Sequence, residues 1–485
     1  MQTYEELVGG EGRLIYYRAE RFRAKDLFGL SHPELTVGGH RLSLHDLSMS
    51  GVAGFDDRSA DWSQSVNRRL PMRLLVGNRP LHESMCEIRR LEPTPFGVKI
   101  GLKLVDSYLD IASLVSRHEE AQVRRELDSD LSAEVAAVPA EYRRVSADVI
   151  HMLHSYRGAL RRLADHAPGQ ADVRLNGMEE VLWHCEERIL PRWRELWFEA
   201  NDLLWPVVED PDVYRAVKSY TETVLTPEFL IGPIWRRGYE KPFGYPGDFK
   251  LMHQIYSHEW QGDTPYGKLV HRLGVHVGEF VANRMVMMKD AIAETVASKP
   301  RGRRAHIASL GAGPAQEVAS YLDVPALPRP ATFTLMDQDH RALSHAYEQT
   351  HPKVLRHGGA AQLRCLHVSF MQLLKAGSIL DELPPQDLIY SVGLTDYLSD
   401  KRVTSLIQAL YERLAPGGRL VIGNVKRSRE ASLWPLEFIA DWNLIYREEA
   451  DMRRLTNGLP GSEREFLSDE TNCVVMAYVK KPEQG

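Results

Sequence analysis

The chain is poor in cysteine, has no long apolar run and carries no basic excess. Its four cysteines stand far apart among 485 residues, so they predict neither a disulfide framework nor a metal-ligand pair. No run of about 18 apolar residues could span a membrane, and the first residues contain no basic and apolar leader. The net charge of -6 argues against non-specific nucleic-acid binding. We therefore expect a cytoplasmic protein without a metal site, a membrane span or a nucleic-acid partner.

A phosphate-binding Gly-x-x-x-x-Gly-Lys-Ser/Thr loop is also missing. In its place, residues 309–317 form a glycine-rich turn between an apolar run and a helical pattern. Gly311 and Gly313 allow a sharp turn and a close approach to a ligand, because neither has a Cβ. A dinucleotide site usually has Gly or Ala at the third glycine position, where this chain has Gln316. The turn therefore indicates a site for a nucleoside without phosphates.

Strand and helix patterns alternate after this turn. A strand at 332–336 ends at Asp337, and further strands are predicted at 363–368 and 387–392. Residues 414–424 are predicted to contain a helix end, a Pro-Gly-Gly turn and then a buried strand. Such alternation favours a parallel sheet covered by helices on both faces. An acid about 20 residues after the glycine turn, at the end of the neighbouring strand, is placed to accept hydrogen bonds from ribose hydroxyls.

This pattern resembles the class I S-adenosylmethionine-dependent methyltransferases. Gly311 and Gly313 match their first motif, Asp337 the acid after the second strand, and 387–394 and 416–423 the fourth and fifth motifs. The resemblance implies S-adenosylmethionine as the cofactor and an α/β Rossmann-like domain. It places the cofactor on Gly311, Gly313, Asp337, Gln338, Ser369, Phe370, Ser391 and Gly393.

The N-terminal part, from 13 to 107, has short strands broken by turns. Residues 35–37 and 40–44 flank Gly38-Gly39, which is a hairpin signal, and 98–105 alternate between apolar and polar. Several short strands at such spacing predict a small β-barrel.

The element Asp46-x-Ser48-x-x-Gly51 in this segment resembles the PilZ domain. That resemblance implies binding of cyclic di-GMP, in which arginines grip the phosphates. Three arginines precede the element, at Arg18, Arg21 and Arg23, but no two have the Arg-x-x-x-Arg spacing of the family. The alternative is a structural or dimerising module in which Asp46 and Ser48 fix a turn.

The central part carries apolar residues at helical spacing over 111–131, 140–166 and 178–204. We interpret it either as a lid or dimerisation bundle, with a homodimer expected, or as a connector. The chain is thus predicted to be multidomain. Its expected parts are a PilZ-like β-barrel at 1–107, an α-helical segment at 108–230 and a methyltransferase domain with an N-terminal substrate lid at 231–485.

A stiff loop at 241–249 contains two prolines, two glycines and three aromatic residues. It precedes the glycine turn and is predicted to roof the pocket of the methyl acceptor. The segment 436–447 is expected to be an aromatic helix that either faces the acceptor or packs on the sheet. Candidate catalytic residues are Tyr245, Asp248, Asp396, Tyr397 and Glu437.

Taken together, these segments resemble the bacterial methyltransferases that make the 3-hydroxypalmitic acid methyl ester signal. The resemblance implies methylation of a small molecule, at the carboxylate of a hydroxy fatty acid. Two alternatives stay open. One is an N- or O-methyltransferase of another small acceptor, and the other is a sensor protein that responds to cyclic di-GMP.

Overall fold

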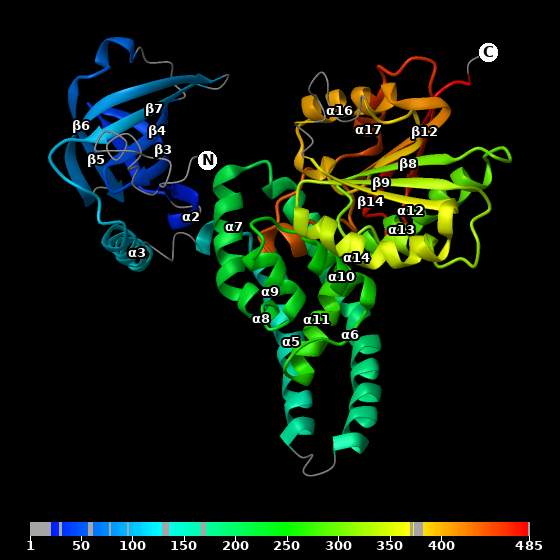
Figure 1. Ribbon diagram of the computed structural model, residues 1–485. Helices are drawn as coiled ribbons and strands as arrows, with labels where there is room; N and C mark the ends of the chain where they lie inside the picture. The colour runs from blue at the N-terminus through cyan, green and yellow to red at the C-terminus, as the bar shows by residue number, and fades with distance from the viewer. Residues whose placement is uncertain are drawn as a thin grey trace. The chain divides into compact units, whose positions relative to one another are not determined.

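A computed structural model describes residues 21–28, 32–56, 62–76, 79–94, 97–128, 135–165, 171–368, 372 and 382–483 (Figure 1). The chain separates into two compact units, Met1–Leu131 (unit 1) and Ser132–Gly485 (unit 2). Each unit has a sheet of its own. No helix in the described ranges is long and apolar enough to cross a membrane.

Unit 1 contains an antiparallel barrel. Strands β2 to β7 pair in the order β3-β2-β5-β6-β7-β4, and β4 pairs back onto β3, which closes the barrel with six strands. The short strand β1 adds to β3. The elements are β1 (Phe22–Arg23), α2 (Ala24–Phe28), β2 (Glu34–Val37), β3 (His40–Ser48), β4 (Gly51–Asp56), β5 (Arg69–Val76), β6 (Arg79–Thr94), β7 (Gly97–Leu104) and α3 (Ile111–Asp128). The predicted barrel is confirmed.

The hairpin of β2 and β3 follows from its two glycines. Gly38 and Gly39 have φ values of +56° and +88°, which are costly for residues with a Cβ. Their turn pairs Val37 with His40, and this register directs Leu35 and Val37 to the interior, where both are fully buried.

Unit 2 contains a sheet of seven strands in the order β10-β9-β8-β11-β12-β14-β13. The five strands from β10 to β12 are parallel, and β14 and β13 are antiparallel to their neighbours. The strands are β8 (Ala305–Leu310), β9 (Ala331–Asp337), β10 (Ala361–His367), β11 (Gln386–Ser391), β12 (Leu414–Val425), β13 (Glu463–Ser468) and β14 (Val474–Lys480). The chain runs outward from β8 in one direction and resumes at β11 in the other, so the strand order reverses between β8 and β11. In open α/β sheets this is the point where ligands bind.

Helices cover both faces of this sheet (Figure 1). Neighbouring strand residues alternate between two cores: Ile307 and Leu388 face one, and Ala308 and Ile389 face the other. The helices are α5 (Ala140–Asp165), α6 (Ala171–Val207), α7 (Pro211–Val224), α8 (Thr226–Phe229), α9 (Pro233–Glu240), α10 (Phe249–Ser257), α11 (Pro265–Val277), α12 (Glu279–Ala297), α13 (Gln316–Tyr321), α14 (His340–Arg356), α16 (Asp400–Glu412) and α17 (Glu449–Thr456).

The helices that precede the sheet share its first core. Trp193 of α6 is fully buried, and its ring centroid lies 5.4 Å from those of Phe229 and Trp434. Asn201 of α6 donates to the carbonyl of Ala431 at 2.6 Å and accepts from the amide of Trp434 at 3.0 Å. The described residues of α5, α6 and α7 therefore belong to unit 2, because their buried apolar side chains share one core with the sheet.

The segment 436–447 does not form the expected helix. A π-helical turn, η6, spans Leu433–Ile439, and the chain then becomes irregular. Asp441 has a φ of +50°, which a continuing right-handed helix does not allow. The amide of Trp442 instead donates to the carbonyl of Leu436 at 2.7 Å. Helical spacing therefore misidentified a segment that folds back over the sheet.

The packing of α11 on α9 leads to a test. A Cβ added at Gly274 would lie 2.4 Å from Cγ2 of Ile234 and 2.8 Å from Nε1 of Trp235. We expect Gly274→Ala to lower the free energy of unfolding by about 1–3 kcal/mol, because the overpacked helices must separate. Chemical denaturation followed by tryptophan fluorescence measures this change.

Gly158 of α5 is the matched control. A Cβ added there meets no atom within 4 Å in the described structure, so Gly158→Ala should raise the free energy of unfolding by about 0.5–1 kcal/mol. A stabilising effect of Gly274→Ala would contradict this packing.

Candidate functional site

A cavity of about 430 Å³ opens at the carboxyl ends of the parallel strands of unit 2. Its walls come from the turns after β8, β9 and β11, from α10 and α12, and from the loop after η6. It lies where the strand order reverses between β8 and β11. No group of three His, Cys, Asp or Glu residues is placed to hold a metal ion in the described ranges.

The glycine turn forms the floor of this cavity. Gly311 and Gly313 have φ values of +67° and +53°, and a Cβ added at Gly313 would meet no described atom within 4 Å. The amides of Gly311 and Ala312 both donate to the carbonyl of Met336, at 2.9 and 3.1 Å. The turn is thus tied to the end of β9 while its glycine surface stays open to a ligand.

Asp337 lies at the end of β9 and lines the cavity. Its Oδ2 accepts from the amide of Gly313 and its Oδ1 from the amide of Asp339, both at 2.9 Å. Burial raises the pKa of Asp337 above its usual value, although the two amides oppose the shift. A carboxylate has about four acceptor positions, so Asp337 can hold the turn and still accept from a ligand.

The predicted lid loop reaches the cavity through Tyr245 and Gly247. Tyr245 lines the cavity, and its hydroxyl donates to Oδ2 of Asp339 at 2.9 Å. A Cβ added at Gly247 would lie 2.4 Å from Cζ2 of Trp442, so the loop packs directly on that ring. Nε1 of Trp442 in turn donates to the hydroxyl of Tyr397 at 2.9 Å. One wall of the cavity therefore carries the linked aromatic side chains of Trp442 and Tyr397, and Tyr245 also lines the cavity.

Two of the predicted catalytic acids point elsewhere. Asp248 is 1% exposed and caps α10, where its Oδ1 accepts from the amides of Lys250 and Leu251. Nε of Arg237 donates to the same oxygen at 2.9 Å. Glu437 is buried and accepts from the hydroxyl of Tyr214 at 3.0 Å. Neither acid is among the residues that line the cavity, so both are placed for structural roles.

Asp396 and Tyr397 do line the cavity, just after β11. Oδ1 of Asp396 accepts from the amide of Val425 at 2.7 Å, and its Oδ2 lies 3.7 Å from Nη1 of Arg284. Burial raises the pKa of Asp396, and the Arg284 charge opposes the shift. Asp396 is thus a buried carboxyl whose second oxygen is beyond hydrogen-bond distance of its nearest cation.

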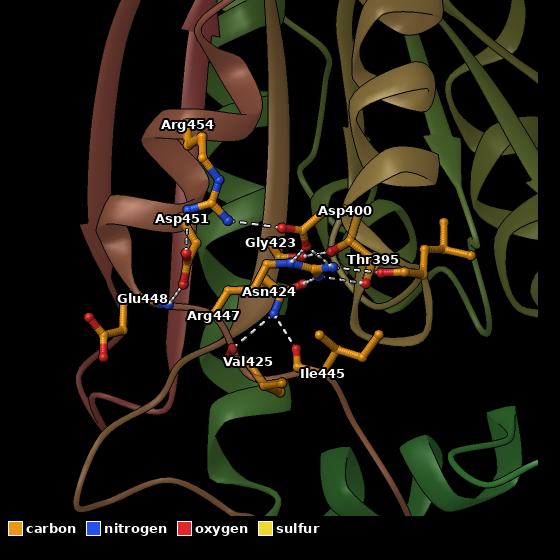
Figure 2. A network of polar contacts seen from close by, with 11 residues as sticks. Thr395, Asp400, Gly423, Asn424, Val425, Ile445, Arg447, Glu448, Asp451 and Arg454 are labelled. Carbon is orange, nitrogen blue, oxygen red and sulfur yellow. Dashed lines mark hydrogen bonds and ion pairs between the residues drawn. The ribbon is translucent and has the colours of Figure 1, made fainter. Parts of the chain in front are cut away.

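The loop that carries these two residues is held by Arg447 (Figure 2). Nη1 of Arg447 donates to the Thr395 carbonyl at 2.9 Å and to Oδ1 of Asn424 at 2.6 Å, and Nη2 donates to the Leu398 carbonyl at 2.6 Å. Nε binds Oδ1 of Asp400 at 3.0 Å. Arg447 is 2% exposed, so its five donors supply the polar partners that the buried loop needs.

The other predicted cofactor residues divide between cavity and interior. Gln338 and Gly393 line the cavity. Ser391 is fully buried and its hydroxyl donates to the Leu310 carbonyl at 2.9 Å, which ties β11 to β8. Ser369 and Phe370 lie outside the described residues.

Sequence reasoning missed several polar side chains on the cavity wall. Among them are Tyr256, Arg284, Glu317 and Tyr390. Arg284 is a single cation among the buried residues of α12, and Glu317 is a buried acid in the first turn of α13. For Arg284 and Glu317, the sequence signal that could have been used was a charged residue on an otherwise apolar helix face.

In unit 1, Asp46 and Arg21, two of the residues predicted to bind cyclic di-GMP, belong to an ion cluster. Asp46 pairs with Arg21 and, at 3.1 Å, with Nζ of Lys99, and its pKa is lowered by these partners against the effect of burial. The Ser48 hydroxyl donates to the Gly51 carbonyl at 3.2 Å, as a turn-forming residue would. Arg18 lies outside the described residues, and Arg23 is exposed at the end of β1.

Comparison with known proteins finds similar solved structures but no matching family. No family model matches the chain, and no curated protein matches it in sequence. A "possible exported protein" from Bordetella parapertussis is 20% identical, with 48% of this chain and 79% of that chain covered and a TM-score of 0.39. The magnesium protoporphyrin IX methyltransferase of Synechocystis PCC 6803 is 11% identical over 48% and 94%, with a TM-score of 0.34. The N-methyltransferase NodS of Bradyrhizobium japonicum is 16% identical over 48% and 99%, with a TM-score of 0.29. At these identities and TM-scores the likeness carries no conclusion about the function of this chain.

The Arg447 cluster yields a stability test. We expect Arg447→Lys to lower the free energy of unfolding by about 3–5 kcal/mol, because three buried acceptors lose donors that an ammonium cannot replace together. Denaturation in urea measures the change. Arg454→Lys is the control: Arg454 binds the same Asp400 at 2.9 Å but is exposed, so it should cost about 0.5 kcal/mol or less. Equal losses in both variants would contradict the role of the buried guanidinium.

Proposed function

We propose that unit 2 is an S-adenosylmethionine-dependent methyltransferase that acts on a small molecule. The observation that carries the proposal is the open glycine turn, tied to Asp337, at the point where the strand order reverses. This is the position in which a doubly wound sheet binds a nucleoside. The resemblance of Gly311, Gly313 and Asp337 to the methyltransferase motifs supports the same assignment.

The cavity fits this cofactor in size and chemistry. Its volume of about 430 Å³ lies within the range of about 300–1,000 Å³ that is usual for small-molecule sites. Asp337 offers a carboxylate to ribose hydroxyls, and the chain has no phosphate-binding loop that would require a nucleotide. Gly311, Gly313 and Asp337 would hold the nucleoside, with Gln338 at its edge.

When bound, S-adenosylmethionine supplies a methyl group on an electrophilic sulfonium sulfur. The protein's part is to hold the acceptor atom in line with that methyl group and to exclude water. Tyr245, Tyr397 and Trp442 form the wall that would position the acceptor. A carboxylate acceptor needs no base, whereas a hydroxyl or amine acceptor must lose a proton. Asp396 is the cavity-lining acid best placed to receive that proton.

For the acceptor itself we propose a molecule with an apolar body. Phe249, Met252, Phe280, Met285 and Leu444 are among the apolar side chains that line the cavity beyond the glycine turn. This lining supports the hydroxy fatty acid that the family resemblance implies, with methyl ester formation as the reaction. It also supports an aromatic acceptor methylated on oxygen or nitrogen.

The proposal is tested with methyl-labelled S-adenosylmethionine and a cell extract fractionated into lipids and polar metabolites. The wild-type protein should transfer label to a small molecule, and Asp337→Asn should bind S-adenosylhomocysteine more weakly by about 1.5–3 kcal/mol, because a charge-assisted acceptor is lost. Calorimetry measures that affinity. Asp323→Asn is the control, since Asp323 pairs at the surface with Lys353 and Arg356. Unchanged affinity in Asp337→Asn would contradict the site.

For unit 1 we propose a regulatory or assembly role. Cyclic di-GMP is the ligand implied by the PilZ resemblance, and a homodimer interface is the alternative. The Arg21–Asp46–Lys99 cluster supports the first choice, because an entering phosphate could take over the two cations from Asp46.

Titration of the full chain with cyclic di-GMP checks this role. If the barrel binds it, Arg21→Ala should weaken binding and added salt should weaken it further, because the contacts are between charges. Arg73→Ala, which removes an exposed arginine paired with Glu83, should have no such effect. If the wild type does not bind cyclic di-GMP, that ligand is excluded and the assembly role remains. Light scattering then measures whether the chain forms a homodimer.

A further inference from the structure

Arg284 and Glu317 bring opposite charges to one cavity. Arg284 comes from α12 and is 9% exposed, and Glu317 comes from the first turn of α13 and is 7% exposed. Both line the cavity at the carboxyl edge of the sheet. Charged side chains are seldom buried to this extent unless they are paired or bind a ligand.

Arg284 lacks a full set of partners. Its Nη1 is buried and has no hydrogen-bond partner among the described residues. The Asp396 carboxylate lies 3.7 Å away, which is an ion pair without a hydrogen bond. A Cβ added at Gly393 would lie 3.1 Å from Nη2, so the guanidinium rests against the backbone after β11. A buried donor in this state is suited to an anion that enters the cavity.

Glu317 is held in place by Tyr390, whose hydroxyl donates to Oε1 at 2.7 Å. Burial raises the pKa of Glu317, and the charge of Arg284 opposes this. The nearby hydroxyl fixes the orientation of the carboxyl group. A cation in the cavity would favour the ionised form of Glu317 and gain a charge-assisted hydrogen bond.

The positions of the charged residues along the sheet edge indicate the direction in which a bound ligand would extend. Asp337 follows β9, Glu317 follows the turn after β8, and Arg284 contacts Gly393 after β11. These strands are adjacent in the order β9-β8-β11. An elongated ligand whose ribose lies at Asp337 would therefore extend its other end toward Glu317 and Arg284.

Resting on the proposed function, we propose that Arg284 and Glu317 clamp the α-amino acid end of S-adenosylmethionine. Arg284 binds the carboxylate and Glu317 the ammonium group. An α-amino acid carries these two charges on one carbon, and the cavity offers one partner for each. The pair makes the site selective for the cofactor over nucleosides without an amino acid.

Equilibrium binding of three ligands tests the clamp without any turnover. S-adenosylhomocysteine has both charges, decarboxylated S-adenosylmethionine lacks the carboxylate, and 5′-methylthioadenosine lacks the whole amino acid. The wild type should bind S-adenosylhomocysteine about ten- to a hundredfold more tightly than 5′-methylthioadenosine. Calorimetry gives the three affinities.

The variants separate the two charges. Arg284→Gln should weaken the binding of S-adenosylhomocysteine about ten- to a hundredfold and leave the affinities for the other two ligands nearly unchanged. Glu317→Gln should weaken both ligands that have an ammonium group and spare 5′-methylthioadenosine. Lys289→Gln removes a cation from α12 outside the cavity lining and is the control for long-range charge effects.

The outcomes distinguish this inference from the proposed function. If the wild type binds none of the three nucleosides, the proposed function fails. If it binds them but Arg284→Gln keeps the wild-type preference for S-adenosylhomocysteine, the clamp is overturned and Arg284 serves the acceptor. Should Arg284→Gln not fold, the wild-type series decides, because equal affinities for S-adenosylhomocysteine and 5′-methylthioadenosine overturn the clamp.

Discussion

The buried guanidinium of Arg447 is the interaction on which the cavity depends. The chain crosses the carboxyl edge of the sheet in irregular loops, and buried backbone groups there need partners. Arg447 donates to two carbonyls of the loop after β11, and to Asn424 at the end of β12 (Figure 2). These bonds hold the loop in the conformation that keeps Asp396 and Tyr397 in the cavity wall.

The same edge of the sheet brings together the other candidate functional residues, because parallel strands have their carboxyl ends at one edge. The glycine turn, Asp337 and Asp396 follow three different strands and meet at one cavity. The helices before the sheet complete it from outside: α12 contributes Arg284, and the loop before α10 contributes Tyr245. This agrees with the place of the described residues between 140 and 300 in unit 2, since they provide one wall of the site and many residues of one of its two cores.

The outcome for individual residues shows which inferences from sequence were sound. Gly311, Gly313 and Asp337 lie as expected, because their positions follow from local turn geometry and strand ends. Asp248 was expected to face the acceptor but caps α10. An acid just before a helix can either cap that helix or face a ligand, and only the direction of the helix in the fold decides between these two roles.

Local sequence patterns were enough to predict the alternation of strands and helices in unit 2, the barrel strands of unit 1 and the location of the glycine turn. Each depends on side-chain periodicity or on glycine, which act over a few residues. Only the tertiary structure placed Arg284 and Glu317 in one cavity, made 440–446 irregular after the helical turn, and gave Arg447 its partners. These depend on contacts between residues tens to hundreds of positions apart, which no local pattern records.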